Sequence, residues 1–111
     1  MVVEFYETAS GRSPVEDFIA SLPKADRARF ADVFEGVEKY GLDCPRAQFR
    51  QLRGKLWEIK FTSKGGGYRI AYVMLSGETM VWLHVFRKQT QKTPVGELEI
   101  AEKRMKEVLE S

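Results

Sequence analysis

The feature that most constrains the fold is a series of strand-like runs in the second half of the chain. From residue 49 to 88 apolar residues recur at about every second position, as in half-buried β-strands. The runs are FRQL, LWEIKFT, YRIAYVML and TMVWLHVFRK, and only RGK, SKGGG and SGE separate them. Such short connectors join antiparallel neighbours, because a parallel pair needs a crossover of a dozen or more residues. This half predicts an antiparallel sheet of three to four strands.

The first half has the period of helices. A β-branched and aromatic start, VVEFY, predicts a short N-terminal strand. Ser13 then stands as an N-cap, Pro14 takes the first helical position, and Glu16 completes a capping-box spacing. A second helical pattern, KADRARFADVFEGVEKYG, follows Pro23 and closes the predicted two-helix hairpin. The outer face of this hairpin is expected to carry Asp26, Asp32, Glu35 and Glu38.

The last part of the chain predicts one more helix, because Thr93 and Pro94 supply an N-cap and a first-turn residue. A chain of 111 residues is one domain's worth, so we expect a single domain over residues 1–111. The predicted fold class is α+β, with a compact antiparallel sheet. Its order is an N-terminal strand, a two-helix hairpin, three to four antiparallel strands and a C-terminal helix. We expect the helices on one face and the other face free for a ligand.

The charge is unevenly distributed along the sequence. The net charge is only +2, yet residues 46–92 contain ten basic and two acidic residues, and the remaining segments are acidic. This asymmetry favours a polyanionic partner, and a solvated surface of ordinary lysines and arginines is the alternative. Among the cations, Lys60, Arg69 and one of Arg87 and Lys88 are expected to converge beside aromatic rings. That combination is typical of single-stranded RNA or DNA binding.

Several classes of protein are disfavoured by composition. The single cysteine, Cys44, excludes an internal disulfide framework, and without a Cys/His cluster no structural zinc site is expected. There is no secretory leader pattern and no apolar run near the ~18 residues that span a bilayer, so we expect a cytoplasmic protein without membrane contact. The SKGGGYR segment lacks a nucleotide-binding pattern and predicts a flexible hairpin turn.

Two residues keep two interpretations each. His84 is the only histidine, and it is either the imidazole acid or base of the site or a hydrogen-bonded core residue. Glu58 is either a proton acceptor or a structural partner of Lys60 or Arg69. Strand alternation places Trp82, His84, Phe86 and Lys88 on one face, and Trp57 and Phe61 in the core.

The second half of the chain resembles the HigB-like, phage-related branch of the RelE/ParE toxin superfamily. The features that carry the resemblance are the LWEIKF strand, the YRIAYV strand and the segment VWLHVFRKQTQKTPVGELEIAEKRM, and the match spans roughly Leu52 to Met105. The resemblance implies a RelE-like sheet with two N-terminal helices and the toxin role of a type II toxin–antitoxin pair. It also implies mRNA cleavage on the translating ribosome, neutralisation by a cognate antitoxin of helix-turn-helix type, and no metal or other cofactor.

The resemblance also implies roles for individual residues. Arg69 matches the arginine of the Y-R-[IV] strand and is expected to stabilise the transition-state phosphate, with Lys60 as the base. At the end of the last strand, Lys88 is the better proton donor and Arg87 the better phosphate clamp, because arginine hardly deprotonates. The remaining candidates are expected to bind RNA: Arg53, Lys55, Phe86 and Lys92.

Departures from the family pattern leave the acid and the base open. Glu58 stands where the RelE type has a lysine, and the C-terminal EKRMKEVLES lacks the tyrosine or histidine of some relatives. His84 therefore stays a candidate. A ParE-like gyrase inhibitor and a non-catalytic phage-derived nucleic-acid-binding protein stay open as alternative functions.

Overall fold

The computed structural model describes residues 1–110 and has the predicted α+β class, with a RelE-like arrangement. The first half holds a short strand and the helical hairpin: β1 (Val2–Phe5), α1 (Pro14–Ala20), α2 (Lys24–Tyr40) and the 3-10 turn η1 (Gly41–Asp43). The second half holds four strands and the closing helix: β2 (Gln48–Arg53), β3 (Leu56–Ser63), β4 (Gly66–Met74), β5 (Thr79–Arg87) and α3 (Val95–Glu110). The Ser13 hydroxyl accepts a hydrogen bond from the Glu16 amide, so this predicted helix start is confirmed.

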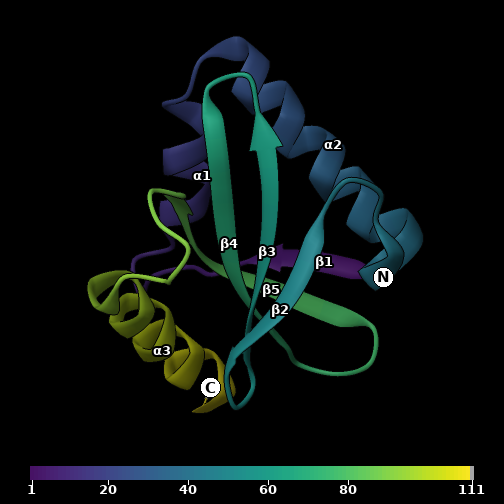
Figure 1. The fold of residues 1–111 in the computed structure, drawn as a ribbon. Helices are drawn as coiled ribbons and strands as arrows, with labels where there is room; N and C mark the ends of the chain where they lie inside the picture. Colours follow the sequence, from purple (N-terminus) through teal and green to yellow (C-terminus); the bar gives the residue numbers. More distant parts are fainter. Residues whose placement is uncertain (111) are drawn as a thin grey trace.

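The strands form one sheet in the order β1-β5-β4-β3-β2 (Figure 1). The pairs β2–β3, β3–β4 and β4–β5 are antiparallel, as their short connectors predict. β1 is parallel to β5. A parallel pair needs a long crossover connection, and the chain between these two strands is long enough to provide it.

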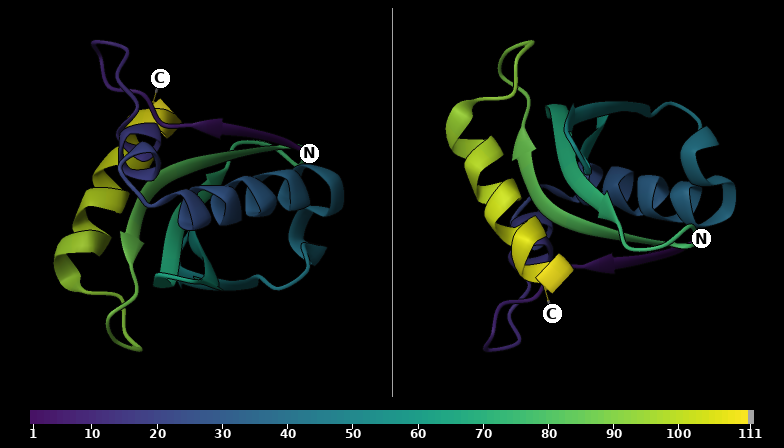
Figure 2. Two further views of the ribbon diagram at one scale, coloured as in Figure 1. Left: turned by 90° about the horizontal axis from the view of Figure 1, so that it is seen from above. Right: turned by 90° about the horizontal axis from the view of Figure 1, so that it is seen from below.

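Helices cover both faces of the sheet. α1 and α2 pack on one face over a core that includes Phe30, Val33, Ile59 and Trp82. α3 packs on the other face through Ala101, against a second core on the sheet. Figure 2 shows α2 and α3 on opposite sides of the strands. The expectation of one free face is therefore wrong, because the amphipathic α3 buries its apolar side against β3–β5.

A β-bulge changes which residues share a face on β5. Ala71 pairs with His84 but Tyr72 pairs with Trp82, which leaves Leu83 as the extra residue. Trp82 consequently lies in the α1–α2 core, whereas His84 lies on the α3 face. The expectation that both share a face is wrong for this reason. Trp57, expected in the core, is 36% exposed.

Asp26 lies inside the protein and not on the acidic outer face. Its carboxylate accepts hydrogen bonds from the Ser63 hydroxyl (2.5 Å), the Tyr68 hydroxyl (2.6 Å) and the Gly65 amide (3.0 Å). These hydrogen bonds lower the pKa of Asp26 below its ordinary value, and the bond from Ser63 has the largest effect. They also attach the β3–β4 turn to the start of α2 (Figure 1). Within residues 1–110 no helix has both the length and the apolar character to cross a bilayer.

Candidate nucleic-acid interface

A hollow of about 580 Å³ lies where β2 and β3 meet the start of α2 and the end of β5. We call it the cationic groove. Four of its lining residues are basic and none is acidic; they are Arg29, Arg46, Lys60 and Lys88, with Ala47, Gln48, Phe61 and Thr62. A concave surface with a single sign of charge concentrates anions. Such a groove can hold phosphate groups.

Sheet register brings the two lysines of the groove to one face. Lys60 on β3 lies between Gln48 on β2 and Arg69 on β4. Just past β5, the Lys88 amide donates to the Gly67 carbonyl (2.9 Å), which continues the antiparallel pairing by one residue. A Cβ at Gly67 would lie 3.3 Å from the Lys88 Cβ, so glycine leaves room for this lysine. The predicted convergence thus selects Lys88 over Arg87.

Arg29 closes the groove on the side of α2. Its Nε donates to the Thr62 carbonyl (3.1 Å) and its Nη2 to the Arg46 carbonyl (3.1 Å), while its guanidinium lies 5.2 Å from the Phe61 ring centroid. Arg46 itself has φ 60°, a left-handed backbone conformation that residues other than glycine rarely adopt. The hydrogen bond from Arg29 helps to hold this conformation.

Arg69 is buried, with 1% of its surface exposed, and its guanidinium binds the segment between β5 and α3. Nη2 donates to the carbonyls of Thr90 and Gln91 (both 2.7 Å), and Nη1 donates to the Thr93 hydroxyl (3.1 Å). Its Nε has no hydrogen-bond partner. The residue expected to bind phosphate therefore holds a loop, and it has no surface from which to reach a ligand in this structure.

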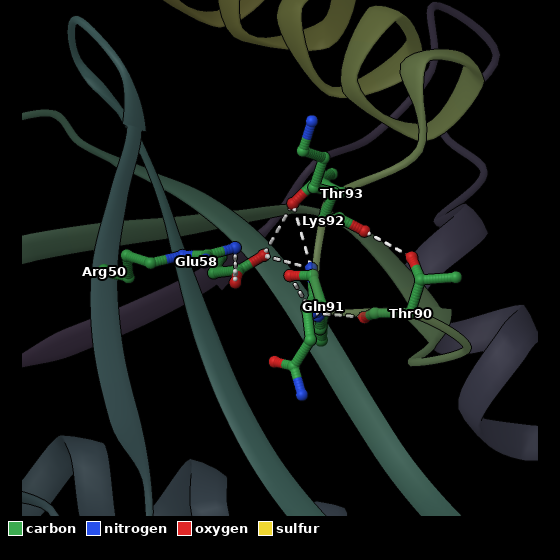
Figure 3. A network of polar contacts seen from close by, with 7 residues as sticks. Arg50, Glu58, Thr90, Gln91, Lys92 and Thr93 are labelled. Atoms are coloured by element: carbon green, nitrogen blue, oxygen red, sulfur yellow. Dashed lines mark hydrogen bonds and ion pairs between the residues drawn. The ribbon is translucent and has the colours of Figure 1, made fainter.

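Glu58 is the counter-charge in this network (Figure 3). It is 1% exposed, and Arg50 donates to its Oε2 at 2.8 Å. The Thr93 hydroxyl donates to its Oε1 (3.2 Å), and Arg69 Nη1 lies 3.7 Å from the same oxygen. Both carboxylate oxygens are occupied, so the geometry fits the structural interpretation of Glu58, with Arg50 and Arg69 as its partners.

His84 lies between β5 and α3, away from the cationic groove. Arg104 Nη1 lies 3.3 Å from its Nδ1, and Glu97 Oε1 lies 3.0 Å from its Nε2. Because arginine can only donate, Nδ1 accepts, and the ring hydrogen is on Nε2, which donates to Glu97. Burial lowers the pKa of His84, although the hydrogen bond to Glu97 acts in the opposite direction. The ring fits the hydrogen-bonded core interpretation.

The other sequence candidates are dispersed. Arg87 lies on the α1–α2 face, where its guanidinium is 5.0 Å from the Tyr68 ring centroid and donates to the Gly65 carbonyl (3.2 Å). Phe86 is 4% exposed and stacks on His84 with a centroid distance of 5.4 Å, so its face is not open to a base.

The β2–β3 turn at the opposite end of the sheet holds two more candidates. Arg53 forms an ion pair with Glu102 of α3 (2.7 Å), and Lys55 is exposed beside it. Lys92 is exposed on the segment that Arg69 holds. Of the ten residues proposed from sequence, only Lys60 and Lys88 line the cationic groove.

The sequence did not single out Arg29 or Arg46 as site residues. Arg29 lies on a helix whose outer face the sequence predicts to be acidic, and Arg46 lies in the connector before β2. Arg29 and Arg46 come together only through tertiary packing. The one sequence feature that pointed to Arg46 is the basic character of residues 46–92. Among residues 1–110, no group of three or more histidine, cysteine, aspartate or glutamate side chains is placed to hold a metal ion.

A family model described as phage derived protein Gp49-like (DUF891) matches residues 17–106. The matched range includes all residues that line the cationic groove and the whole Arg69 network. No curated protein matches the chain.

Proposed function

The chain belongs to the Gp49-like family of phage-derived proteins, and from this premise we propose that it is the toxin of a type II toxin–antitoxin system. The proposed activity is metal-independent cleavage of mRNA on the ribosome. Two findings support it: the family is associated with RelE-type toxins, and the sheet has a RelE-like arrangement. The observation that carries it is the groove of four cations without a carboxylate. A helix-turn-helix antitoxin is the proposed protein partner.

In the proposed reaction, the 2′-hydroxyl of the RNA attacks the adjacent phosphorus. A bond from the 2′-oxygen to phosphorus forms and the bond to the 5′-oxygen breaks, which leaves a 2′,3′-cyclic phosphate and a 5′-hydroxyl. One group takes the 2′-hydroxyl proton, another gives a proton to the 5′-oxygen, and cations stabilise the phosphorane charge.

The groove offers two kinds of side chain for these steps. Arginine stays protonated, whereas lysine exchanges protons. We therefore assign proton transfer to Lys60, as the base, and Lys88, as the acid. Arg29 and Arg46 are assigned to holding the phosphate. Arg69 is assigned a positioning role, because it fixes the segment that follows Lys88 through Thr90, Gln91 and Thr93.

The test is to express the protein briefly and map new 5′-hydroxyl ends on mRNA. Lys60→Gln and Lys88→Gln are each expected to lower the cleavage rate about 10²-fold or more, and to relieve growth arrest. Lys55→Gln, on the exposed turn at the other end of the sheet, is the matched control and should cut as well as wild type.

Two outcomes would overturn the proposal. One is a Lys60→Gln/Lys88→Gln double variant that cuts mRNA at the wild-type rate. The other is intact mRNA during growth arrest together with inhibition of gyrase supercoiling, which would favour the ParE-like function. Salt-sensitive RNA binding without any new 5′-hydroxyl ends would favour the non-catalytic binding protein.

A further inference from the structure

A second hollow, of about 310 Å³, lies beside the cationic groove along α2. We call it the α2 groove. It shares Arg29 and Arg46 with the cationic groove, and it reaches Lys39 and Tyr40 at the end of the helix. The helix side chains that line it recur at the spacing of one face of α2; they are Arg29, Asp32, Glu35, Lys39 and Tyr40. The two hollows therefore adjoin at Arg29 and Arg46, which are hydrogen-bonded to each other, and together they mark a path across the surface.

Tyr40 presents an aromatic ring at the far end of this path. Half of its surface is exposed, and the Lys39 ammonium lies 5.3 Å from the ring centroid. Exposed rings beside cations are platforms on which nucleic-acid bases stack. Tyr40 is thus an open aromatic platform on the groove, which buried Phe86 is not.

The wall opposite α2 is held in place by close packing. The segment after α2 turns back at Gly41, which has φ 61°, and lies against the helix at Gly36. A Cβ at Gly36 would lie 2.6 Å from the Cys44 sulfur, so only glycine allows this approach. Two residues later the chain reaches Arg46, whose carbonyl accepts from Arg29. The groove is thus a shaped feature, with walls that the local backbone determines.

The two grooves differ in charge. The cationic groove is lined by four cations and no carboxylate, whereas the α2 groove adds Asp32 and Glu35 between Arg29 and Lys39. Carboxylates repel phosphate but accept hydrogen bonds from the amino group of a base, as Asp and Glu do from cytosine N4. The chemistry of the α2 groove suits a base, while its neighbour suits the phosphate backbone.

We propose that the α2 groove is a nucleobase subsite for the single-stranded RNA whose phosphates the cationic groove holds. In this arrangement a base stacks on Tyr40, and Asp32 and Glu35 favour a base with an exocyclic amino group. The inference rests on the proposed function, since it extends the same RNA path. Arg29 and Tyr40 are separated by about 16 Å along the helix axis, which corresponds to about five stacked nucleotides at about 3.4 Å each.

The experiment measures binding of fluorescent RNA by anisotropy at fixed salt. The probes are a trinucleotide and oligocytidylate and oligouridylate of about ten nucleotides, long enough to span both grooves. Tyr40→Ala is expected to weaken binding of the long oligocytidylate about fivefold or more and to leave trinucleotide binding unchanged. Tyr40→Phe keeps the ring and should bind as wild type. Asp32→Asn/Glu35→Gln should reduce the preference for cytidine over uridine.

The variants separate this inference from the proposed function. If Lys60→Gln and Lys88→Gln weaken binding of all probes but Tyr40→Ala changes none, the nucleobase subsite is wrong and the cationic groove stands. If the lysine variants bind every probe as wild type does, RNA does not lie in the cationic groove and the subsite is wrong. The proposed function is tested separately, by the rate at which the same lysine variants cut mRNA. Equal loss of long and short probes in Tyr40→Ala would also overturn the subsite, because that loss would not report on the far end of the path.

Discussion

At the scale of single residues, burial separates the groups that hold the fold from those that can meet a ligand. Arg69 and Glu58 are each 1% exposed, and both bind the Thr93 hydroxyl. Lys60 and Lys88, by contrast, are partly exposed to solvent. A substitution at Arg69 therefore disturbs the folded state as well as any site. Loss of toxicity in an Arg69 variant does not by itself assign a catalytic role.

We predict that Arg69→Met lowers the free energy of unfolding by about 2 kcal/mol, because the buried Glu58 carboxylate then keeps only Arg50 as a counter-charge. Replacing both partners, in Glu58→Met/Arg69→Met, should return the free energy of unfolding to within about 1 kcal/mol of wild type. Urea denaturation measures both. Lys60→Gln and Lys88→Gln are the controls, with changes of about 0.5 kcal/mol or less. A double variant less stable than Arg69→Met would contradict this account.

Asp26 predicts a pH dependence of stability. Its folded pKa lies below the ordinary value of 3.8, because Ser63, Tyr68 and Gly65 donate to the carboxylate. The unfolded chain therefore binds the proton more readily. The stability from the ionised carboxylate is present above pH 3.8 and is lost as the pH falls through the lower folded pKa.

The measurement compares wild type with Asp26→Asn, which cannot ionise. The wild-type chain should have the larger free energy of unfolding at neutral pH. The difference should shrink as the pH is lowered below 3.8 and through the lower folded pKa of Asp26. A difference that stays constant over this range would show that ionisation of Asp26 does not stabilise the fold.

At the scale of elements, the local sequence pattern predicts which helices and strands are present better than it predicts the contacts between them. The Ser13–Pro14 start, the two-residue alternation and the short connectors are all local signals, and the helices and antiparallel strands they indicate are present. The bulge at Leu83 has no such signal, because it depends on how β5 pairs with β4. The same holds for Asp26, whose burial depends on donors more than thirty residues away.

The candidate site follows the same rule. Lys60 and Lys88 are predictable because strand register brings them together. Arg29 and Arg46 are not, since they meet only when α2 and the segment after it pack on the sheet.

The segment that follows α2 packs against the helix at Gly36. We predict that Gly36→Ala changes the free energy of unfolding in opposite directions with and without the Cys44 sulfur. Gly36→Ala in the wild-type chain should cost about 1–3 kcal/mol, because the new methyl meets the Cys44 sulfur at 2.6 Å. In a Cys44→Ala background the sulfur is absent, and Gly36→Ala should instead stabilise by up to about 1 kcal/mol through its better helix propensity. Thermal and urea unfolding of the four chains measure this. The same sign in both backgrounds would show that the contact does not shape the groove.

At the scale of the whole molecule, the charges are separated in space as well as in sequence. The basic stretch 46–92 supplies Arg46, Lys60 and Lys88 to one end of the sheet, and α2 adds Arg29. The basic residues of the β2–β3 turn lie at the opposite end of β3. Composition alone predicts a polyanionic partner but not which of the cations bind it.

This separation predicts how RNA binding responds to salt. If the four cations of the cationic groove each neutralise one phosphate, the plot of log affinity against log salt concentration should have a slope of about −2.8, since each contact on a single strand contributes about −0.7. Lys60→Gln and Lys88→Gln should each make the slope shallower by about 0.7. Lys55→Gln should leave it unchanged, because Lys55 is outside the groove. The measurement is anisotropy of a labelled RNA of about ten nucleotides over a salt series. Equal changes in slope for Lys55→Gln and Lys60→Gln would mean that RNA is attracted by the general charge of the basic stretch, and that the groove does not define the path.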